Sequence, residues 1–366
     1  MSTHMLKTTR IRQNYSTQSL LEIWANRYKL DALKLITECT GDMLMLAIND
    51  EGRQQTAEKV HKWVKISNEV AGLKTNSLFA YAPNVVSLED ARRISNVVTQ
   101  IYTKLLDIYQ KQQTTPPWTD LINTLNSSDS AVQKMSQVSA IDLFVIQQIA
   151  DEIEPLILEL QSQHLASPDQ RMIGFMSTQF HFSTQVLFSY LQPIEQILLR
   201  PYLQFVEEQV CIPWQRICAA AGYHTADSLK LEIVKSMLIQ SEEIADETYF
   251  QIVARLPQHH SRRGLLTQRD VATSSISDIN MFQAYLCLCV LEGNTSSIRN
   301  ELLPLCLMVF PAISVDWELV EIGLDVMISC IQERLNPEGF PLVKIYMTTM
   351  NQLFAKAKED PEYLNA

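Results

Sequence analysis

The chain has 366 residues, which is enough for one large domain or two domains of ordinary size. Its hydrophobic share of 46% and charged share of 19% exclude wholesale disorder, and its net charge of −11 argues against a dedicated nucleic-acid coat or a polybasic membrane binder. It has only 9 glycines and 14 prolines, about half of average usage. Because sheet proteins need many glycine-rich turns, this shortage favours helices joined by few connections.

The first third of the chain contains three helix predictions and one ambiguous run. Apolar spacing predicts helices over residues 17–37 and 55–72. The run from Asp42 to Ile48 is compatible with either a short strand or a buried helix. The strongest pattern begins at Ser87, a helix N-cap followed three residues later by a carboxylate, and its apolar ladder continues through Tyr109.

Helical patterns also cover most of the remaining chain. A second well-patterned helix is predicted to open at Ser314, with Asp316 and Glu318 at the positive end of its dipole, and to continue through Ile331. Prolines within or between the other segments mark kinks or new helix starts. The other predicted helices span residues 130–163, 169–191, 193–210, 226–239, 242–256, 277–292, 296–309 and 341–358.

Residues 114–130 have the composition of a linker, because they are mostly polar and contain Pro116-Pro117. This linker would separate an N-terminal helical region, 1–113, from a larger C-terminal helical domain, 131–366. Within that domain, residues 256–277 are predicted to form an irregular basic loop. No signature recurs at the roughly 33- to 47-residue periods of helical solenoids. The sequence therefore predicts an all-α, irregular multi-helix bundle with no substantial β-sheet, and not a regular solenoid.

The seven cysteines are scattered through apolar segments. An odd number in a long chain indicates reduced, buried thiols rather than a disulfide framework. The first residues contain no apolar signal core, and no window reaches the roughly 18 apolar residues of a spanning helix, since prolines interrupt the longest candidate, Leu302 to Val315. We therefore expect a cytoplasmic protein without a membrane span.

Metal and nucleotide sites have no support in the residue pattern. Cys287 and Cys289 form the closest cysteine pair, but residues two apart on a helix point about 200° apart and cannot chelate one ion. The acidic run from Glu242 to Glu247 lacks the second acidic motif that magnesium-dependent helical enzymes need, and helix capping accounts for it. Glycine-rich phosphate loops and a nucleophile elbow are absent. The sequence nominates no catalytic residue, no metal ligand and no cofactor.

An aromatic helix provides one candidate binding site. His181 lies among Phe175, Phe180 and Phe188, and a helix so rich in aromatic residues could line an apolar pocket for a flat ligand. The same spacing suits the packing face of a central helix, which is the commoner use of such residues. These four residues are the pocket candidates.

The segment from Arg255 to Arg269, called the basic segment below, is the best candidate contact site. It has no acidic residue before Asp270, although the chain as a whole is acidic. Its cations would suit a phosphate group, an acidic partner surface or a nucleic-acid backbone. A solvated loop whose arginines pair with acids such as Glu242 or Glu247 would have the same sequence. The candidate contact residues are Arg255, His259, His260, Arg262, Arg263 and Arg269.

Two apolar stretches, Phe205 to Cys218 and Glu301 through Trp317, lie in the C-terminal half of the chain. They resemble an uncharacterised all-helical family of cyanobacterial appearance. The resemblance implies a cytoplasmic bacterial protein of a photosynthetic cell. It implies no activity and no site residue.

Together these patterns favour a non-enzymatic interaction protein, such as a regulator, adaptor or assembly factor, that acts through helical surfaces and the basic segment. Another protein is the expected partner, and a homo-oligomer is compatible with the apolar helix faces. One alternative is a helical ligand-binding or sensory module around His181. Another is a nucleic-acid-binding regulator that uses Arg262, Arg263 and Arg269, and an all-α enzyme is a third.

Overall fold

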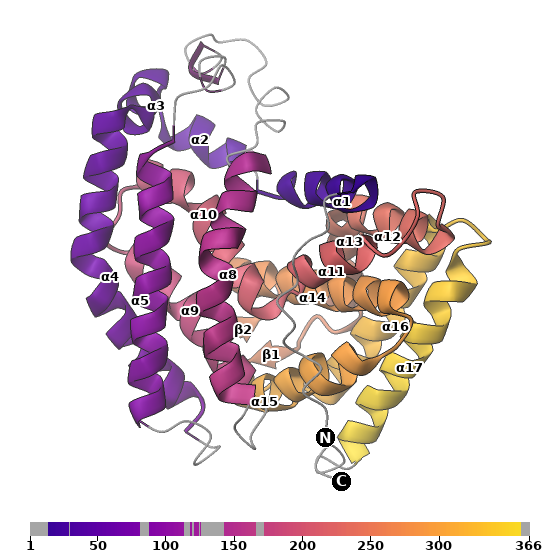
Figure 1. Cartoon of the computed structure of the whole chain (residues 1–366). Coiled ribbons are helices and arrows are strands. Elements are labelled where there is room, and N and C mark those ends of the chain that lie inside the picture. The colour runs from indigo at the N-terminus through magenta and orange to yellow at the C-terminus, as the bar shows by residue number, and fades with distance from the viewer. Residues whose placement is uncertain are drawn as a thin grey trace. The chain divides into compact units, whose positions relative to one another are not determined.

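The computed structural model describes residues 14–28, 30–80, 88–112, 118, 121–123, 125, 143–165 and 172–359. These residues form helices and one two-stranded sheet, so the protein has the all-α, irregular architecture that the sequence predicts (Figure 1). Contacts within the chain divide it into two compact units, each of which is described by itself.

Unit 1 contains most of α1 and the elements from α11 to the C-terminus, and unit 2 contains the helices between them. The helices of unit 2 are α2 (Ala32–Glu38), α3 (Gly41–Ile48), α4 (Asp50–Leu78), α5 (Leu88–Gln110), α8 (Leu143–Leu165) and nearly all of α9 (Met172–Phe188) and α10 (Pro193–Cys211). The elements of unit 1 are α1 (Tyr15–Ala25), α11 (Trp214–Ala221), α12 (Leu229–Ile239), α13 (Ser241–Arg255), β1 (His260–Ser261), β2 (Gly264–Leu265), α14 (Arg269–Glu292), η1 (Ile298–Leu302), α15 (Leu303–Ile313), α16 (Trp317–Arg334) and α17 (Phe340–Glu359).

The two units differ from the regions that the sequence predicts on either side of residues 114–130. Most of that stretch lies outside the described residues. Helices α5 and α8, which flank it in the chain, pack against each other within unit 2. Because both helices belong to unit 2, the division at 114–130 is not the division between the compact units.

Helices α4 and α5 show the predicted packing most clearly. The apolar ladder on α5 is confirmed, since Ile94, Val98 and Ile101 are fully buried. Helix α4 lies beside α5 (Figure 1), and Asn68 donates a hydrogen bond of 2.7 Å to the Thr99 hydroxyl across the pair. The predicted N-cap at Ser87 lies outside the described residues.

Two predictions near the N-terminus change in detail. The helix predicted over 17–37 is two helices, α1 and α2, because the Asp31 side chain accepts a hydrogen bond from the Lys34 N–H and caps a new helix. The run from Asp42 to Ile48 is helix α3, with Thr40 as its N-cap. Only part of α3 is buried, and Leu46 is 65% exposed.

Helix α14 forms the centre of unit 1. It packs against α11, α12, α13 and α17, and every residue from Asn280 to Leu291 is buried. A helix that is apolar on all sides needs such surroundings in a folded core. Contrary to the expectation that no window is apolar enough, its segment Val271–Glu292 is the one described helix long and apolar enough to cross a membrane, although 61% of its apolar window is buried inside the structure. Length and composition alone are weak evidence for a span.

The helix predicted to open at Ser314 begins later, and that prediction is wrong in detail. Helix α15 continues past Pro311 to Ile313, and Ser314 ends it in a left-handed conformation with φ 57°. Such a residue is a common helix C-terminus. The N-cap position of α16 is therefore Asp316. Sequence reasoning also missed the short helix α11, which precedes α12.

Candidate functional site

The basic segment folds as a short β-hairpin between two helices. Helix α13 ends at Arg255, strands β1 and β2 pair antiparallel, and α14 begins at Arg269. The irregular loop predicted over 256–277 is therefore too long, because helix α14 includes its last nine residues, 269 to 277. The first buried residue of α14 is Val271, which is 5% exposed.

Local hydrogen bonds define the hairpin turn. Ser261 pairs with Gly264, which leaves Arg262 and Arg263 as the two turn residues. The Ser261 hydroxyl accepts a hydrogen bond from the Arg263 N–H and donates one to the Gly264 carbonyl, both at 3.1 Å. Gly264 has φ 124°, a conformation that residues with a side chain rarely adopt. The sequence Ser-Arg-Arg-Gly thus places two adjacent arginines at the tip.

The base of the hairpin is held by apolar packing. Ile252 of α13, Leu266 beyond β2 and Val271 of α14 form a buried cluster, which Leu319 of α16 helps to cover. The Tyr249 hydroxyl donates a hydrogen bond of 2.6 Å to the Leu266 carbonyl. The chain on both sides of the hairpin is therefore fixed to helices.

The tip is also attached to the end of α15. The Arg262 N–H donates a hydrogen bond of 2.8 Å to the Ile313 carbonyl, and Arg262 Nε donates one of 3.2 Å to the Ser314 hydroxyl. Because these bonds use the backbone and one nitrogen of the guanidinium, they fix where Arg262 lies while the rest of its side chain stays exposed.

Five of the six predicted contact residues are exposed, namely Arg255, His260, Arg262, Arg263 and Arg269. The exception is His259, whose side chain is only 7% exposed and whose Nδ1 lies 3.6 Å from an Asp316 carboxylate oxygen. The His259 side chain therefore faces the interior of the protein and contacts Asp316, the N-cap residue of α16. The two histidines are adjacent in the chain, and the strand that begins at His260 turns them in opposite directions.

The pairing of these arginines with nearby acids, which the sequence left open, does not involve Glu247. That carboxylate forms an ion pair with Arg334 of α16 instead. Among the described residues, Arg255, Arg262 and Arg269 form no ion pair with an acidic side chain. Arg255, Arg262 and Arg269 are thus held by their elements without an acidic side chain that neutralises them among the described residues.

Another arginine of unit 1 shows what internal neutralisation looks like. Arg216 of α11 binds Glu301 of η1 and Glu292 at the end of α14. Although burial acts against it, the two carboxylates raise the pKa of Arg216 above its ordinary value. This cluster joins three elements, and the charge of its arginine is neutralised within the protein.

The aromatic candidates of α9 do not converge on a pocket. Phe175 and Phe180 are buried and pack against Phe79 and Tyr102, respectively. The His181 side chain is 36% exposed and its Nδ1 lies 3.5 Å from Glu207. Phe188 is also buried, with the Arg200 guanidinium 4.9 Å from its ring centroid. The phenylalanines therefore form core, while His181 faces the surface.

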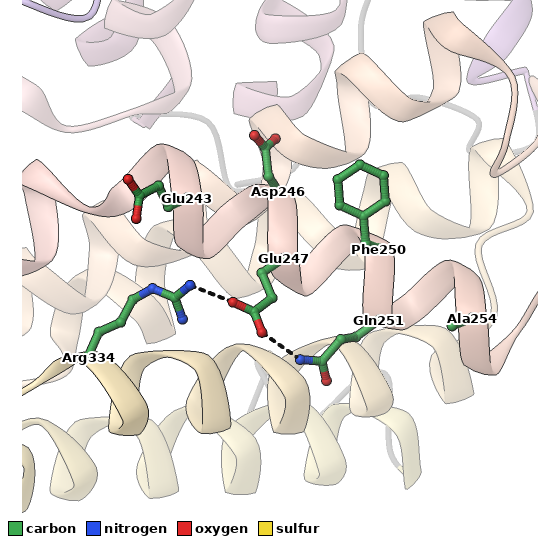
Figure 2. Close-up of a pocket in the computed structure, with 7 residues that line it drawn as sticks. All are labelled: Glu243, Asp246, Glu247, Phe250, Gln251, Ala254 and Arg334. Atoms are coloured by element: carbon green, nitrogen blue, oxygen red, sulfur yellow. Dashed lines mark hydrogen bonds and ion pairs between the residues drawn. The ribbon is translucent and has the colours of Figure 1, made fainter.

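Sequence reasoning missed a groove between α13 and α16, called the acidic groove below (Figure 2). Its volume is about 530 Å³. Its lining residues are Glu243, Asp246, Glu247, Phe250, Gln251, Ala254 and Arg334. The signal that could have found it is Phe250, an aromatic residue on the polar face of an amphipathic helix.

The electrostatics of the acidic groove are uneven. Hydrogen bonding and charge from Arg334 lower the pKa of Glu247. Burial raises the pKa of Asp246, and the neighbouring Glu242 raises it further. Figure 2 shows Glu247 directed toward Arg334, whereas Asp246 and Phe250 point away from that pair. One carboxylate is thus neutralised and the next is not.

The next features are the cysteine thiols and the side chains that could bind a metal ion. None of the seven cysteines is in a disulfide, and five of them are buried. Burial raises the pKa of Cys218 to about 12 and that of Cys289 to about 11, so neither thiol is a nucleophile near neutral pH. No group of three or more His, Cys, Asp or Glu side chains in the described part of the chain could hold a metal ion.

Comparison with protein-family models, with curated proteins and with solved structures finds no match to this chain.

Proposed function

We propose that this protein is a non-enzymatic cytoplasmic interaction protein, a regulator, adaptor or assembly factor, that contacts an acidic partner protein through the basic segment. The observation that supports this best is the hairpin itself. Its backbone is fixed to α13, α14 and α15, whereas Arg262 and Arg263 are exposed at its tip.

A fixed backbone favours binding because less conformational freedom is lost when the partner arrives. Arginine forks match carboxylates in a bidentate geometry that lysine cannot reproduce, and the exposed cations of known position here are mostly arginines. The hairpin therefore suits a specific acidic surface better than diffuse counter-ion attraction.

A nucleic acid fits the same segment less well. Tight nucleic-acid binders neutralise about 6–10 phosphates, usually along an extended basic stripe. The basic segment has five exposed cationic side chains at most, in a chain whose net charge is −11. The long-range field of such a chain repels a polyanion. A discrete acidic patch on a protein needs only the few contacts that the hairpin offers.

The test is quantitative affinity capture from extracts of the source cell with three forms of the full chain. These are the parent protein, the R262E/R263E variant and a control variant, K65E/R92E, that reverses the same number of charges at exposed positions of α4 and α5. We expect partners that the parent and the control capture and that R262E/R263E loses. Circular dichroism should show that all three forms are equally helical.

Two results would contradict the proposal. An identical set of captured proteins with the parent and R262E/R263E would show that the hairpin is a solvated turn. If R262E/R263E loses bound nucleic acid rather than protein, the basic segment recognises nucleic acid and not an acidic protein. Nuclease treatment of the extract separates that result from protein capture.

A further inference from the structure

The core of unit 2 encloses a group of polar side chains between its helices. Ser67 and Asn68 of α4 and Gln179 and Ser183 of α9 are completely buried, with no exposed surface. Each has one side-chain atom without a hydrogen-bond partner among the described residues, namely Ser67 Oγ, Asn68 Oδ1, Gln179 Oε1 and Ser183 Oγ. Because nearly all buried polar atoms in folded proteins have such a partner, this concentration on two helices indicates a binding site for something polar.

Helices α4 and α9 run antiparallel, which brings the four residues to one level. Trp63 of α4 stacks on Tyr190, just beyond the end of α9, with ring centroids 4.2 Å apart. One backbone turn and more away, a methyl group built on Gly72 of α4 would lie 3.6 Å from Gln179 Nε2. On both helices the buried serine lies between these two contacts, so the two serines face the same part of the core.

Hydrogen bonds to α5 fix the direction of both amide side chains. The NH2 group of Asn68 donates to the Thr99 hydroxyl, and that of Gln179 donates to the Ser95 hydroxyl, both at 2.7 Å. Each hydroxyl in turn donates to a backbone carbonyl of α5, at 2.8 Å for Thr99 and 3.0 Å for Ser95. The hydroxyls must therefore accept from the amides, and neither amide can be flipped. Both amide oxygens consequently point away from these hydroxyls.

The chemistry of the four atoms defines the molecule that would satisfy them. An amide oxygen only accepts hydrogen bonds, whereas a hydroxyl can donate or accept. Water does both, and a buried water makes about three hydrogen bonds to groups of this kind. None of the four side chains is charged, so a cation would be buried there without a counter-charge at high cost. Gly72 leaves room beside them, since a methyl group built there meets no atom closer than 3.4 Å.

We propose that a shared cluster of ordered water occupies this part of unit 2 and bridges α4 to α9. The water donates to Asn68 Oδ1 and Gln179 Oε1 and exchanges hydrogen bonds with the hydroxyls of Ser67 and Ser183. It completes a network in which each amide is already bound to α5. A slide of α9 along α4 would break this network, so the water site holds the two helices in one register.

A crystal structure of the full chain tests the site directly. We expect density for water at about 2.7–3.2 Å from both Asn68 Oδ1 and Gln179 Oε1. Protein donors on both oxygens, or two oxygens without solvent beside them, would overturn the proposal. So would an anomalous signal at this place in crystals soaked with rubidium, because carbonyl and hydroxyl oxygens then hold a monovalent cation instead.

Coupling between the two serines tests the shared water in solution. Ser67→Ala and Ser183→Ala each remove a hydroxyl that is bonded to the water, so each should lower the Tm by about 2–4 °C. Because both hydroxyls hold the same cluster, the second substitution should lower the Tm less in the background of the first than it does alone. Thermal unfolding of the parent, the two single variants and the double variant measures this difference.

Thr75→Val is the matched control. Thr75 is equally buried, but its hydroxyl donates a hydrogen bond of 2.8 Å to the Ala71 carbonyl of its own helix. Its effect should therefore be additive with that of Ser183→Ala. If Ser67→Ala and Ser183→Ala leave the Tm unchanged or raise it, the hydroxyls have no water to lose and the proposal is wrong. Strictly additive losses in the double serine variant would exclude a shared cluster.

Discussion

Helix α9 and the basic segment are the two candidate sites that the sequence singles out, and the structure treats them in opposite ways. The candidate phenylalanines of α9 are buried in the core of unit 2, and Phe180 has no exposed surface. The arginines of the basic segment are exposed around a hairpin whose backbone is fixed within unit 1. One pattern therefore describes a core and the other describes a surface.

The difference follows from what each side chain gains by burial. A buried aromatic ring gains hydrophobic and packing energy from any apolar neighbour, so an aromatic helix can be satisfied by its own protein. A buried guanidinium gains only where carboxylates compensate its desolvation, as Glu292 and Glu301 do for Arg216. Arginines without such partners stay at the surface, where they are available to another molecule.

The largest expected effect concerns the buried phenylalanines of helix α9. Phe180→Ala should lower the free energy of unfolding by about 3–5 kcal/mol, because it leaves a cavity against Tyr102 in the core of unit 2. Urea denaturation followed by circular dichroism measures the change. The neighbouring His181→Ala, at a partly exposed position, should change the free energy of unfolding by about 0.5 kcal/mol or less. Equal effects of the two substitutions would mean that α9 lines an open pocket after all.

The next effect tests whether the hairpin is a fixed structure. Gly264→Ala forces a side chain into a backbone with φ 124°, and its Cβ would collide with the Gln268 side chain. We expect a loss of about 1–3 kcal/mol. Gly72→Ala in α4 is the matched control: its Cβ meets only ordinary contacts there, so the substitution should be neutral or stabilising. Unchanged stability in Gly264→Ala would show that the hairpin is not held in this conformation.

Much of the fold could be predicted because helical periodicity is a local signal. The ladder from Ile94 through Tyr109 requires nothing beyond the spacing of apolar residues, and α5 bears it out. Helix ends are harder, since they depend on competition between neighbouring elements. Ser314 is a good N-cap residue by type, but α15 continues to Ile313 and takes Ser314 as its own end.

The candidate site was predictable in composition and not in shape. Six basic residues from Arg255 to Arg269 are visible in the sequence, but nothing local separates His259, whose side chain is only 7% exposed, from the exposed His260. That separation comes from the hairpin, which depends on distant contacts with Ile313. The acidic groove leaves only Phe250 as a signal in the sequence, because Arg334 lies far along the chain from Glu247 and meets it only when α16 packs on α13.

A smaller effect concerns the exposed arginines of the basic segment. Because Arg262 is exposed and forms no ion pair with an acidic side chain among the described residues, Arg262→Ala should change the free energy of unfolding by no more than about 0.5 kcal/mol. Arg216→Ala is the contrasting variant, since it leaves Glu292 and Glu301 without their cation and should be much less stable. Urea denaturation of both variants measures the two changes in the free energy of unfolding. Comparable losses would show that Arg262 is structural.

The smallest effect distinguishes the two carboxylates of the acidic groove by their dependence on pH. Burial and Glu242 raise the pKa of Asp246 above 3.8. As the pH rises from below 3.8 through the raised value, the folded state keeps a proton that the unfolded state has released, so the free energy of unfolding falls. Asp246→Asn removes this penalty. The variant should match the parent in acid and be slightly more stable near neutral pH.

Glu247 should behave in the opposite way. Its hydrogen bond and ion pair with Arg334 lower its pKa below 4.5, so the stability it contributes is complete above 4.5 and is lost as the pH falls through the lowered value. Glu247→Gln should therefore be less stable than the parent near neutral pH and equal to it in strong acid. Thermal unfolding of dilute protein across the acid range measures both variants against the parent. Differences of the same sign in the two variants would mean that Arg334 neutralises both carboxylates of the groove.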